Sequence, residues 1–163
     1  MSLVLRSPNF AEQATLPKEQ VHHAMDAGGQ NVSPELTWSG APEGTKSFAL
    51  TMYDPDAPTG SGWWHWVVYD IPASATSLPK GAGVAGNAQL PKGAKQGRTD
   101  FGSKEYGGAA PPPGHGPHRY IFTLYALKVD KLDVPEDASA AYIGFMIHFA
   151  KIAEAKLTAK YER

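Results

Sequence analysis

The sequence SFALTMY at residues 47–53 decides the fold class of this chain. Its side chains follow the two-residue period of a β-strand, and apolar residues occupy both sets of alternating positions. Two later segments, residues 65–71 and 118–128, are rich in the aromatic and β-branched residues that fit a pleated surface. We therefore predict a mainly β protein whose first central strand is buried on both faces.

The C-terminal part of the chain predicts one helix followed by one strand. Between residues 138 and 154, Phe145, Phe149 and Ile152 stand at helical spacing and predict an amphipathic to buried helix. Residues 155–161 return to strict alternation, which indicates a closing strand. This order predicts a β domain that carries a helix near its C-terminus.

Glycine and proline are unusually frequent, with 17 and 14 residues among 163, well above the average share of these two types. Much of this content lies in residues 81–117, where periodicity is weak. We expect long irregular connections on the surface there, and binding sites tend to lie on such loops. No repeat, linker or change of composition divides the chain, so we predict a single domain over residues 1–163.

Charge and cysteine content argue against several functions. Fifteen basic and 16 acidic residues give a net charge of −1, so the chain lacks the positive field that binding to nucleic acid or to an anionic bilayer requires. There is no cysteine, and therefore no disulfide or thiolate metal site. The first ten residues lack the apolar run of a secretory signal, and no segment is long and apolar enough to span a membrane. We expect a cytoplasmic protein.

Residues from distant parts of the sequence are predicted to meet at one end of the sheet. Asp54 directly follows the first strand, and His65 begins the second strand after the loop DPDAPTGSGWW. If these two strands pair as a hairpin, both residues lie at the same loop-bearing edge. His118 enters the third strand from a Gly/Pro-rich loop and can share that edge, and alternation puts Tyr120 on the same face. The sequence therefore predicts a shallow pocket.

This set of side chains suits a small oxyanion. Imidazole rings that are protonated or suitably oriented donate hydrogen bonds, and the Tyr120 hydroxyl and loop amides can add more. Asp54 has a role in such a pocket if it keeps a neighbouring histidine cationic or orients that ring by accepting its N–H. We therefore predict an anion pocket around Asp54, His65 and His118.

The same segments resemble a known family. The stretches NVSPELTWSGAPEGTKSFALTMYDPDAPTG (31–60), WWHWVVYDIP (63–72) and YGG to PPPGHGPHRYIFTLYAL (106–127) are similar to the phosphatidylethanolamine-binding protein family, and most of all to its bacterial Raf-kinase-inhibitor-like branch. The similarity runs from about Leu5 to Arg163. DPDAP followed by a later G-x-H-R-Y is a specific signature of this resemblance.

The resemblance implies two antiparallel β-sheets in a Greek-key-like sandwich, a C-terminal helix and long Gly/Pro-rich loops. It also implies a small pocket for phosphate, phosphorylethanolamine-like groups or other small anions. Carried over position by position, the pocket comprises Asp54, Asp56, His65, His118 and Tyr120, with a loop amide near Ala110. The segment GAAP at residues 108–111 departs from the Gly-Pro or Pro-Cys pattern of relatives, so the conformation of that loop is not implied.

Structural explanations compete for some of these positions. Asp56 can simply stabilise its own turn, as Asp near Ala-Pro often does, and Ala57–Pro58 is a candidate cis bond. Alternation turns Arg119 to the opposite face from His118, so we expect Arg119 to form a structural ion pair.

Other aromatic and histidine residues have mainly structural expectations. Trp63, Trp64 and Trp66 are expected to pack rather than to serve as stacking platforms, although Trp64 can form a wall of the pocket. His115 is a candidate for the rim of the pocket. His148 lies among apolar helix residues, so we expect a hydrogen-bonded structural histidine there.

The leading functional prediction is a non-enzymatic binding and regulatory protein. It would recognise a phosphorylated or otherwise anionic group, including one carried by a protein partner such as a kinase. The alternative is a histidine-based hydrolase or phosphatase acting on small phosphoesters, with His65 or His118 as base or nucleophile. The chain offers no cysteine, and neither TGSGWW nor SPELTWSG matches the G-x-S-x-G nucleophile motif. We therefore predict no enzymatic activity.

Two further questions concern metals and assembly. Two histidines and two aspartates suit zinc or manganese in type, but their spacing fits no familiar metal motif, so no cofactor is predicted. Relatives in the resembling bacterial branch tend to dimerise, and the predicted helix is apolar on more than one face. We therefore expect a homodimer.

Overall fold

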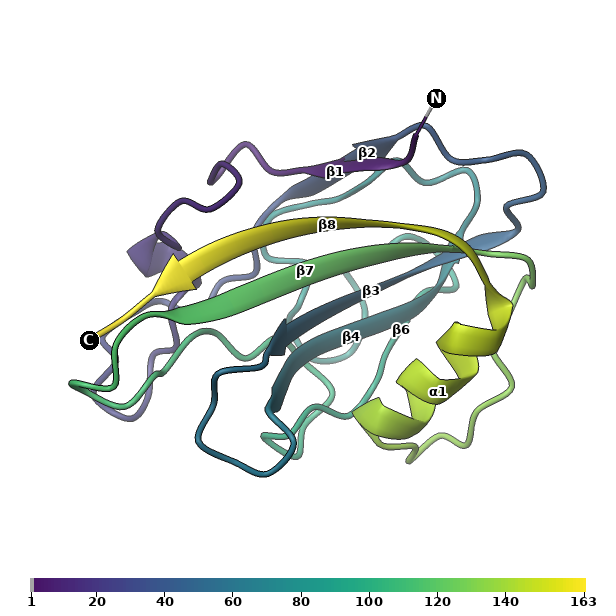
Figure 1. The fold of residues 1–163 in the computed structure, drawn as a ribbon. Coiled ribbons are helices and arrows are strands. Elements are labelled where there is room, and N and C mark those ends of the chain that lie inside the picture. The colour runs from purple at the N-terminus through teal and green to yellow at the C-terminus, as the bar shows by residue number, and fades with distance from the viewer. Residues whose placement is uncertain (1) are drawn as a thin grey trace.

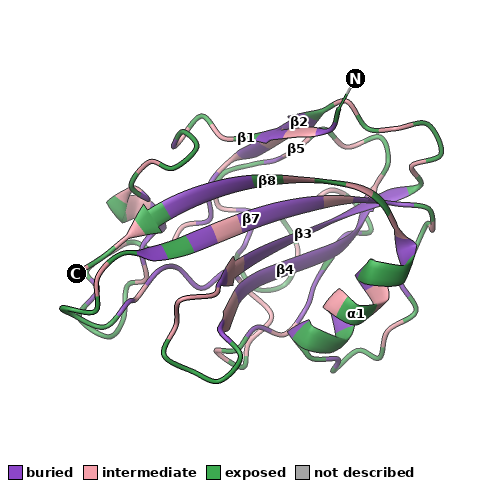
Figure 2. Cartoon of the chain, viewed as in Figure 1, coloured by how far each residue is buried: buried purple, intermediate pink, exposed green. Residues whose placement is uncertain are grey.

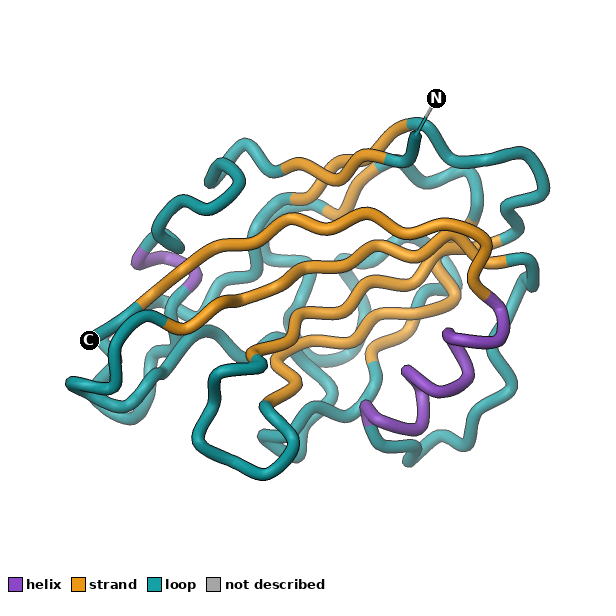
Figure 3. Tube along the Cα trace, in the orientation of Figure 1, coloured by secondary structure: helices purple, strands orange, loops and turns teal. Residues whose placement is uncertain are grey.

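The computed structural model describes residues 2–163 and contains two antiparallel sheets and one C-terminal α-helix (Figure 1). The smaller sheet has the strand order β1 (Val4–Arg6), β2 (Leu36–Ser39), β5 (Ser77–Leu78). The larger sheet has the order β6 (Lys95–Gln96), β4 (Trp63–Pro72), β3 (Ser47–Asp54), β7 (His118–Leu127), β8 (Lys151–Tyr161). A short 3-10 helix, Lys18–Gln20, and helix α1 (Ala140–Ala150) complete the fold. Long loops connect these elements (Figure 3), and the predicted fold class is confirmed.

Strand β3 is the centre of the larger sheet, with β4 on one side and β7 on the other. Nearly all of its residues are buried (Figure 2). On one face Phe48, Leu50 and Met52 belong to the core between the two sheets, and on the other face Ala49 belongs to a second core beneath α1. The prediction of a strand buried on both faces is confirmed, because a sheet covers one face and a helix covers the other.

The strands of the smaller sheet are too short to produce a visible period in the sequence. β1 has 3 residues and β5 has 2. Packing holds them in place: Leu36 and Leu78 are fully buried, and Trp38 contacts Phe48 of β3 with ring centroids 5.5 Å apart. The smaller sheet therefore closes the core over one face of the larger sheet.

The boundary between helix and closing strand differs from the prediction. Helix α1 ends at Ala150, and β8 begins at Lys151 rather than at residue 155. Lys151 and Ala153 already pair with β7, so strand pairing overrides the helical spacing of this stretch. Among the helices of residues 2–163, none is long and apolar enough to cross a membrane.

The apolar residues of the predicted helix are divided between its two faces, and Ile152 lies in β8. Phe145 and Phe149 are 61% and 59% exposed, whereas Ile143 and Ile147 are buried against the sheet. His148 is also exposed, and its side chain makes no hydrogen bond with any residue from 2 to 163, so the expectation of a hydrogen-bonded structural histidine there is wrong. The helix therefore uses its isoleucines for the core and presents an aromatic face outward.

Part of the region at residues 81–117 is buried, although surface loops were expected. The Tyr106 hydroxyl donates to the carbonyl oxygen of Gln20 at 2.7 Å, and Gln96 of β6 accepts the indole N–H of Trp66 at 2.7 Å. Both bonds lie in the interior, where a partner for every polar group is needed. They anchor the loops that form one wall of the site.

Candidate functional site

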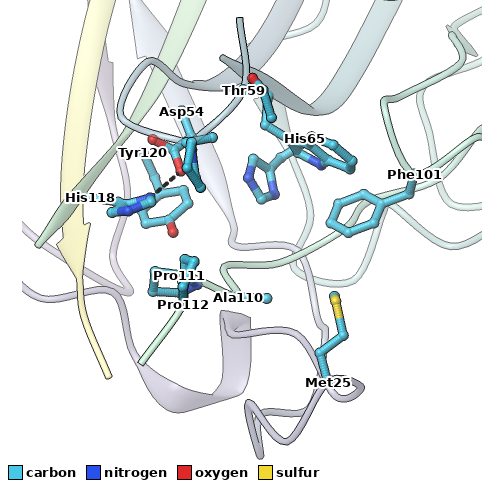
Figure 4. Close-up of a pocket in the computed structure, with 13 residues that line it drawn as sticks. Met25, Asp54, Thr59, His65, Phe101, Ala110, Pro111, Pro112, His118 and Tyr120 are labelled. Carbon is cyan, nitrogen blue, oxygen red and sulfur yellow. Dashed lines mark hydrogen bonds and ion pairs between the residues drawn. The ribbon is translucent and has the colours of Figure 1, made fainter. Parts of the chain in front are cut away.

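Asp54, His65 and His118 meet at one edge of the larger sheet, as the sequence predicts (Figure 4). Asp54 ends β3 and pairs with Trp63, which begins β4, while His118 begins β7 on the other side of β3. A cavity of about 220 Å³ lies at this edge. Five of the six predicted site residues line it: Asp54, His65, Ala110, His118 and Tyr120.

The walls of the cavity are mostly apolar. Side chains without hydrogen-bonding groups supply about half of the lining, namely Met25, Ala57, Pro58, Phe101, Ala110, Pro111 and Pro112. Hydrogen bonds and charges act more strongly in such surroundings than in water. The few polar groups that reach the cavity therefore decide which ligand it accepts.

Asp54 and His118 form a buried pair. Nδ1 of His118 lies 2.6 Å from Oδ2 of Asp54, and both residues are at most 3% exposed. The other carboxylate oxygen accepts the backbone N–H of Asp56 at 2.8 Å. Because a carboxylate can only accept, the His118 ring carries a proton on Nδ1. Asp54 thus orients His118, which is one of the two roles predicted for it.

The second nitrogen of His118 is also engaged. Nε2 lies 2.5 Å from Nδ1 of His115, an exposed residue of the loop before β7. Gly114 and Gly116 flank His115, and both have positive φ, 78° and 88°, which glycine adopts without strain. The loop conformation that they permit places His115 on His118, although His115 is not among the residues from 2 to 163 that line the cavity. Neither nitrogen of His118 is therefore free toward the cavity.

The ring of His65 is hydrogen-bonded differently from that of His118. Its Nδ1 lies 2.8 Å from the carbonyl oxygen of Gly107, and a carbonyl only accepts, so Nδ1 carries the proton. Burial lowers the pKa of His65 to about 4, so the ring is neutral near pH 7. In a neutral ring protonated at Nδ1, Nε2 is an acceptor. His65 therefore offers a lone pair, whereas the sequence predicted a donor.

Two donors near the cavity are unsatisfied. Tyr120 Oη and Trp63 Nε1 are buried and make no hydrogen bond with any residue from 2 to 163, and both residues line the cavity. Figure 4 shows the Tyr120 hydroxyl directed toward Pro111. Burial raises the pKa of Tyr120, so it remains an O–H donor. Each unsatisfied buried donor costs about 1–3 kcal/mol, which a ligand oxygen would recover.

Of the two tryptophans at the start of β4, Trp63 rather than Trp64 borders the cavity. Trp63, expected only to pack, lines the cavity, and its ring meets Phe101 edge-on at 5.3 Å. Trp64 packs on Tyr53 with ring centroids 4.3 Å apart and joins the core under α1, which confirms its expected packing and leaves the alternative of a pocket wall to Trp63. Alternation along β4 turns neighbouring residues to opposite faces, and the sequence alone does not say which face carries the cavity.

Asp56 is a correction to the predicted site. Within the described part of the chain it is not among the lining residues, and its two carboxylate oxygens accept from Nε and Nη2 of Arg119, each at 2.9 Å. This pair lowers the pKa of Asp56 to about 2. The predicted structural ion pair of Arg119 is confirmed, and Asp56 is its partner. The peptide bond between Ala57 and Pro58 is trans, as are all those of residues 2–163, so the cis prediction is wrong.

The loop at residues 107–110 is firmly held despite its unusual GAAP sequence. The N–H of Gly108 donates to Oδ1 of Asn31 at 2.7 Å, and the carbonyl of Ala109 accepts from His22 at 2.9 Å. The N–H of Gly107 donates to the carbonyl of His65 at 3.0 Å. These bonds fix the wall that presents Ala110 to the cavity.

Arg163 lies beside the cavity, and no local pattern in the sequence indicates this. Its guanidinium donates to the carbonyl oxygens of Pro111 and Met25 at 2.7 and 2.8 Å, and both of those residues line the cavity. Its charge is near enough to act on the ionisation of Tyr120. Arg163 thus joins two loops at the mouth and places a cation beside the cavity.

The histidine and acidic side chains of the site are not arranged as a metal centre. Across residues 2–163, no group of three or more histidine or acidic side chains is arranged to hold a metal ion. Asp54 and His118 bind each other, and Asp56 binds Arg119. The acidic groups of the site are used within the protein.

Fold and site together define a class of protein: a two-sheet β domain with a small pocket at the edge of its larger sheet, built around a buried Asp–His pair. The chain belongs to the phosphatidylethanolamine-binding protein family, whose sequence profile, described as "Phosphatidylethanolamine-binding protein", matches residues 6–162. The predicted resemblance is therefore confirmed.

Similar proteins of known sequence and structure agree with the bacterial branch. UPF0098 protein YbhB of Escherichia coli is 53% identical over 157 residues, which cover 96% of this chain and 98% of that protein. UPF0098 protein YbcL of the same organism is 54% identical over 147 residues, covering 90% and 80%. The crystal structure of E. coli YbcL superposes with a TM-score of 0.97 at 49% identity, covering 100% of this chain and 99% of that one.

Proposed function

We propose that this protein is a non-enzymatic binding protein for a small oxyanion, such as a phosphoryl group. The observation that carries the proposal is the pair of unsatisfied donors, Tyr120 Oη and Trp63 Nε1, at a cavity of about 220 Å³. Ligand oxygens would accept from both. The guanidinium of Arg163 at the rim adds positive charge where an anion would enter.

Inorganic phosphate is the first ligand to test, by titration calorimetry. Tyr120→Phe removes one hydroxyl and keeps the ring, so it should weaken phosphate binding by about tenfold, the ratio expected for one hydrogen bond. Arg119→Gln is the matched control, because its guanidinium binds Asp56 outside the cavity. No phosphate binding by the unaltered protein, or full affinity in Tyr120→Phe, would contradict the proposal.

The phosphatase alternative has one observation in its favour, the buried Asp54–His118 pair, because a carboxylate orients the catalytic histidine in many hydrolases. Two observations oppose it. His118 has no nitrogen left for a nucleophile, and the hydroxyl of Thr59, which lines the cavity, donates to the carbonyl of Gly62 at 2.6 Å. Turnover of a small phosphomonoester that is lost in His118→Ala would restore this alternative.

A phosphorylated protein is one partner that could present such a ligand, and regulation of a kinase is the form this would take by analogy with the family branch. The cavity supports only the recognition of the phosphoryl group. A phosphoserine peptide that binds more tightly than inorganic phosphate would indicate a protein partner, and equal affinity would indicate a small-molecule ligand.

We also propose that the protein forms a homodimer through the outer face of α1. This face exposes Tyr142, Phe145 and Phe149, with Ile152 just beyond the helix, at 42–61% each. Clusters of exposed large apolar side chains favour association. Light scattering should show a dimer, and the double substitution Phe145→Ser with Phe149→Ser should convert it to a monomer. Val84→Ser is the control: Val84 is an exposed apolar residue outside α1, so this variant should remain a dimer. A monomer before any substitution would refute this assembly.

A further inference from the structure

We propose that the ligand must itself bring a hydrogen-bonding proton, so that the site selects oxyanions that carry an acidic hydroxyl, such as hydrogen phosphate and phosphonate monoanions, over sulfates and sulfonates. This inference rests on the proposed function and deepens it. It follows from the balance of donors and acceptors that the protein presents to the cavity.

The acceptor in this balance is Nε2 of His65. The Gly107 carbonyl, 2.8 Å from Nδ1, keeps the ring proton on the far side, and the ring is only 4% exposed. Phe101 and Tyr120 meet the ring edge-on, with centroids 5.4 and 5.2 Å away, and the Tyr120 hydroxyl makes no hydrogen bond to it or to any other residue from 2 to 163. Burial opposes the charged form of His65 most strongly, and His22 and His118 oppose it further, so that the ring stays neutral although the backbone carbonyls of Gly107 and Gly108 favour its charged form.

The donors are the hydroxyl of Tyr120 and the indole N–H of Trp63, both without a partner among residues 2–163. Because the rings of His65 and Tyr120 are adjacent, one small tetrahedral ion can reach both. A phosphonate monoanion accepts from the donors through its bare oxygens and donates its hydroxyl to Nε2 of His65. A sulfonate has only acceptor oxygens, so one of them would face the lone pair of Nε2.

Methylphosphonate and methanesulfonate provide a matched pair for calorimetry. Near pH 6 both are small tetrahedral ions with a single negative charge, and they differ by one hydroxyl. We expect methylphosphonate to bind at least about tenfold more tightly, the ratio that one buried hydrogen bond supplies. Equal affinities would overturn the inference while leaving the proposed anion site intact. Failure of both ions to bind would overturn the anion site and this inference together.

The variant His65→Gln tests whether His65 causes the preference for methylphosphonate over methanesulfonate. A glutamine amide can turn either its oxygen or its NH₂ to the ligand, so the preference for methylphosphonate should shrink to about twofold or less. Tyr120→Phe should weaken both ions and leave their ratio unchanged, because it removes a donor that both ions use. If His65→Gln keeps the full preference for methylphosphonate, another residue causes the selectivity and the inference is overturned.

A spectroscopic readout does not depend on any variant folding. Nitrogen-15 NMR of the unaltered protein should show His65 as a neutral ring with its proton on Nδ1 at pH 6 to 7. Its Nε2 resonance should move when methylphosphonate is added and stay in place with methanesulfonate. A His65 ring that carries a proton on Nε2 before ligand is added would overturn the inference.

Discussion

Replacing His65 by glutamine should make the free energy of unfolding less sensitive to acid. In the folded protein burial lowers the pKa of His65 from 6.5 to about 4. Between these values the unfolded chain binds a proton at residue 65 that the folded protein does not, so stability falls as the pH falls from 6.5 toward 4. From about pH 7.5 to about pH 4.5 this one group removes about 2.5 kcal/mol.

Urea denaturation at these two pH values measures the effect. His65→Gln lowers the free energy of unfolding at both pH values, because it changes a buried group that bonds Gly107. The drop in this free energy from about pH 7.5 to about pH 4.5 should, however, be about 2.5 kcal/mol smaller in His65→Gln than in the unaltered protein. The exposed His23 supplies the control, and His23→Gln should keep the full acid sensitivity. Other titrating groups are common to both proteins and cancel in the comparison. Parallel losses in His65→Gln and the unaltered protein would refute the assignment of a buried neutral ring.

Three further substitutions test the contacts around the site. Asp54→Ala leaves the buried Nδ1–H of His118 without its acceptor and should lower the free energy of unfolding by about 3–5 kcal/mol in urea. Asp56→Ala removes a partly exposed ion pair and the acceptor of the Arg119 backbone N–H, so it should cost about 1–2 kcal/mol in urea and leave the calorimetric phosphate affinity unchanged; a large loss of affinity would mean that Asp56 belongs to the pocket after all. Gly108→Ala would press its Cβ into the backbone carbonyl of Gln20, and thermal unfolding should show a loss of at least about 1–3 kcal/mol, whereas an unchanged Tm would mean that this loop yields easily.

The sequence was sufficient to predict four of the five strands of the larger sheet because these are long and strongly patterned, whereas β6 has only 2 residues and was expected to be loop. The predicted strand at residues 47–53 corresponds to β3 with one residue added, and that at 118–128 corresponds to β7 with one removed. The smaller sheet was not predicted because strands of two to four residues have no measurable period. The end of α1 was misplaced because pairing with β7 is a tertiary effect that local spacing does not contain.

The site was predictable in position and only partly in chemistry. Strand ends place Asp54, His65 and His118 at one edge, and an antiparallel sheet brings such ends together. Arg163 was missed because it reaches the rim from the far end of the chain. Trp63 was expected only to pack because alternation defines two faces of β4 without saying which of them borders a cavity.

The chemistry of a histidine in such a site is decided by the partner of each ring nitrogen, and loops supply those partners. His65 and His118 stand near the starts of the two strands that flank β3 and look equivalent in the sequence. The carbonyl of Gly107 makes His65 an acceptor toward the cavity, while Asp54 and His115 occupy both nitrogens of His118. A different loop conformation at Gly107 would convert His65 into a donor without changing any residue that lines the cavity. Relatives with the same acid and the same two histidines can therefore differ in ligand preference, and the loop at residues 107–110 is the place to compare them.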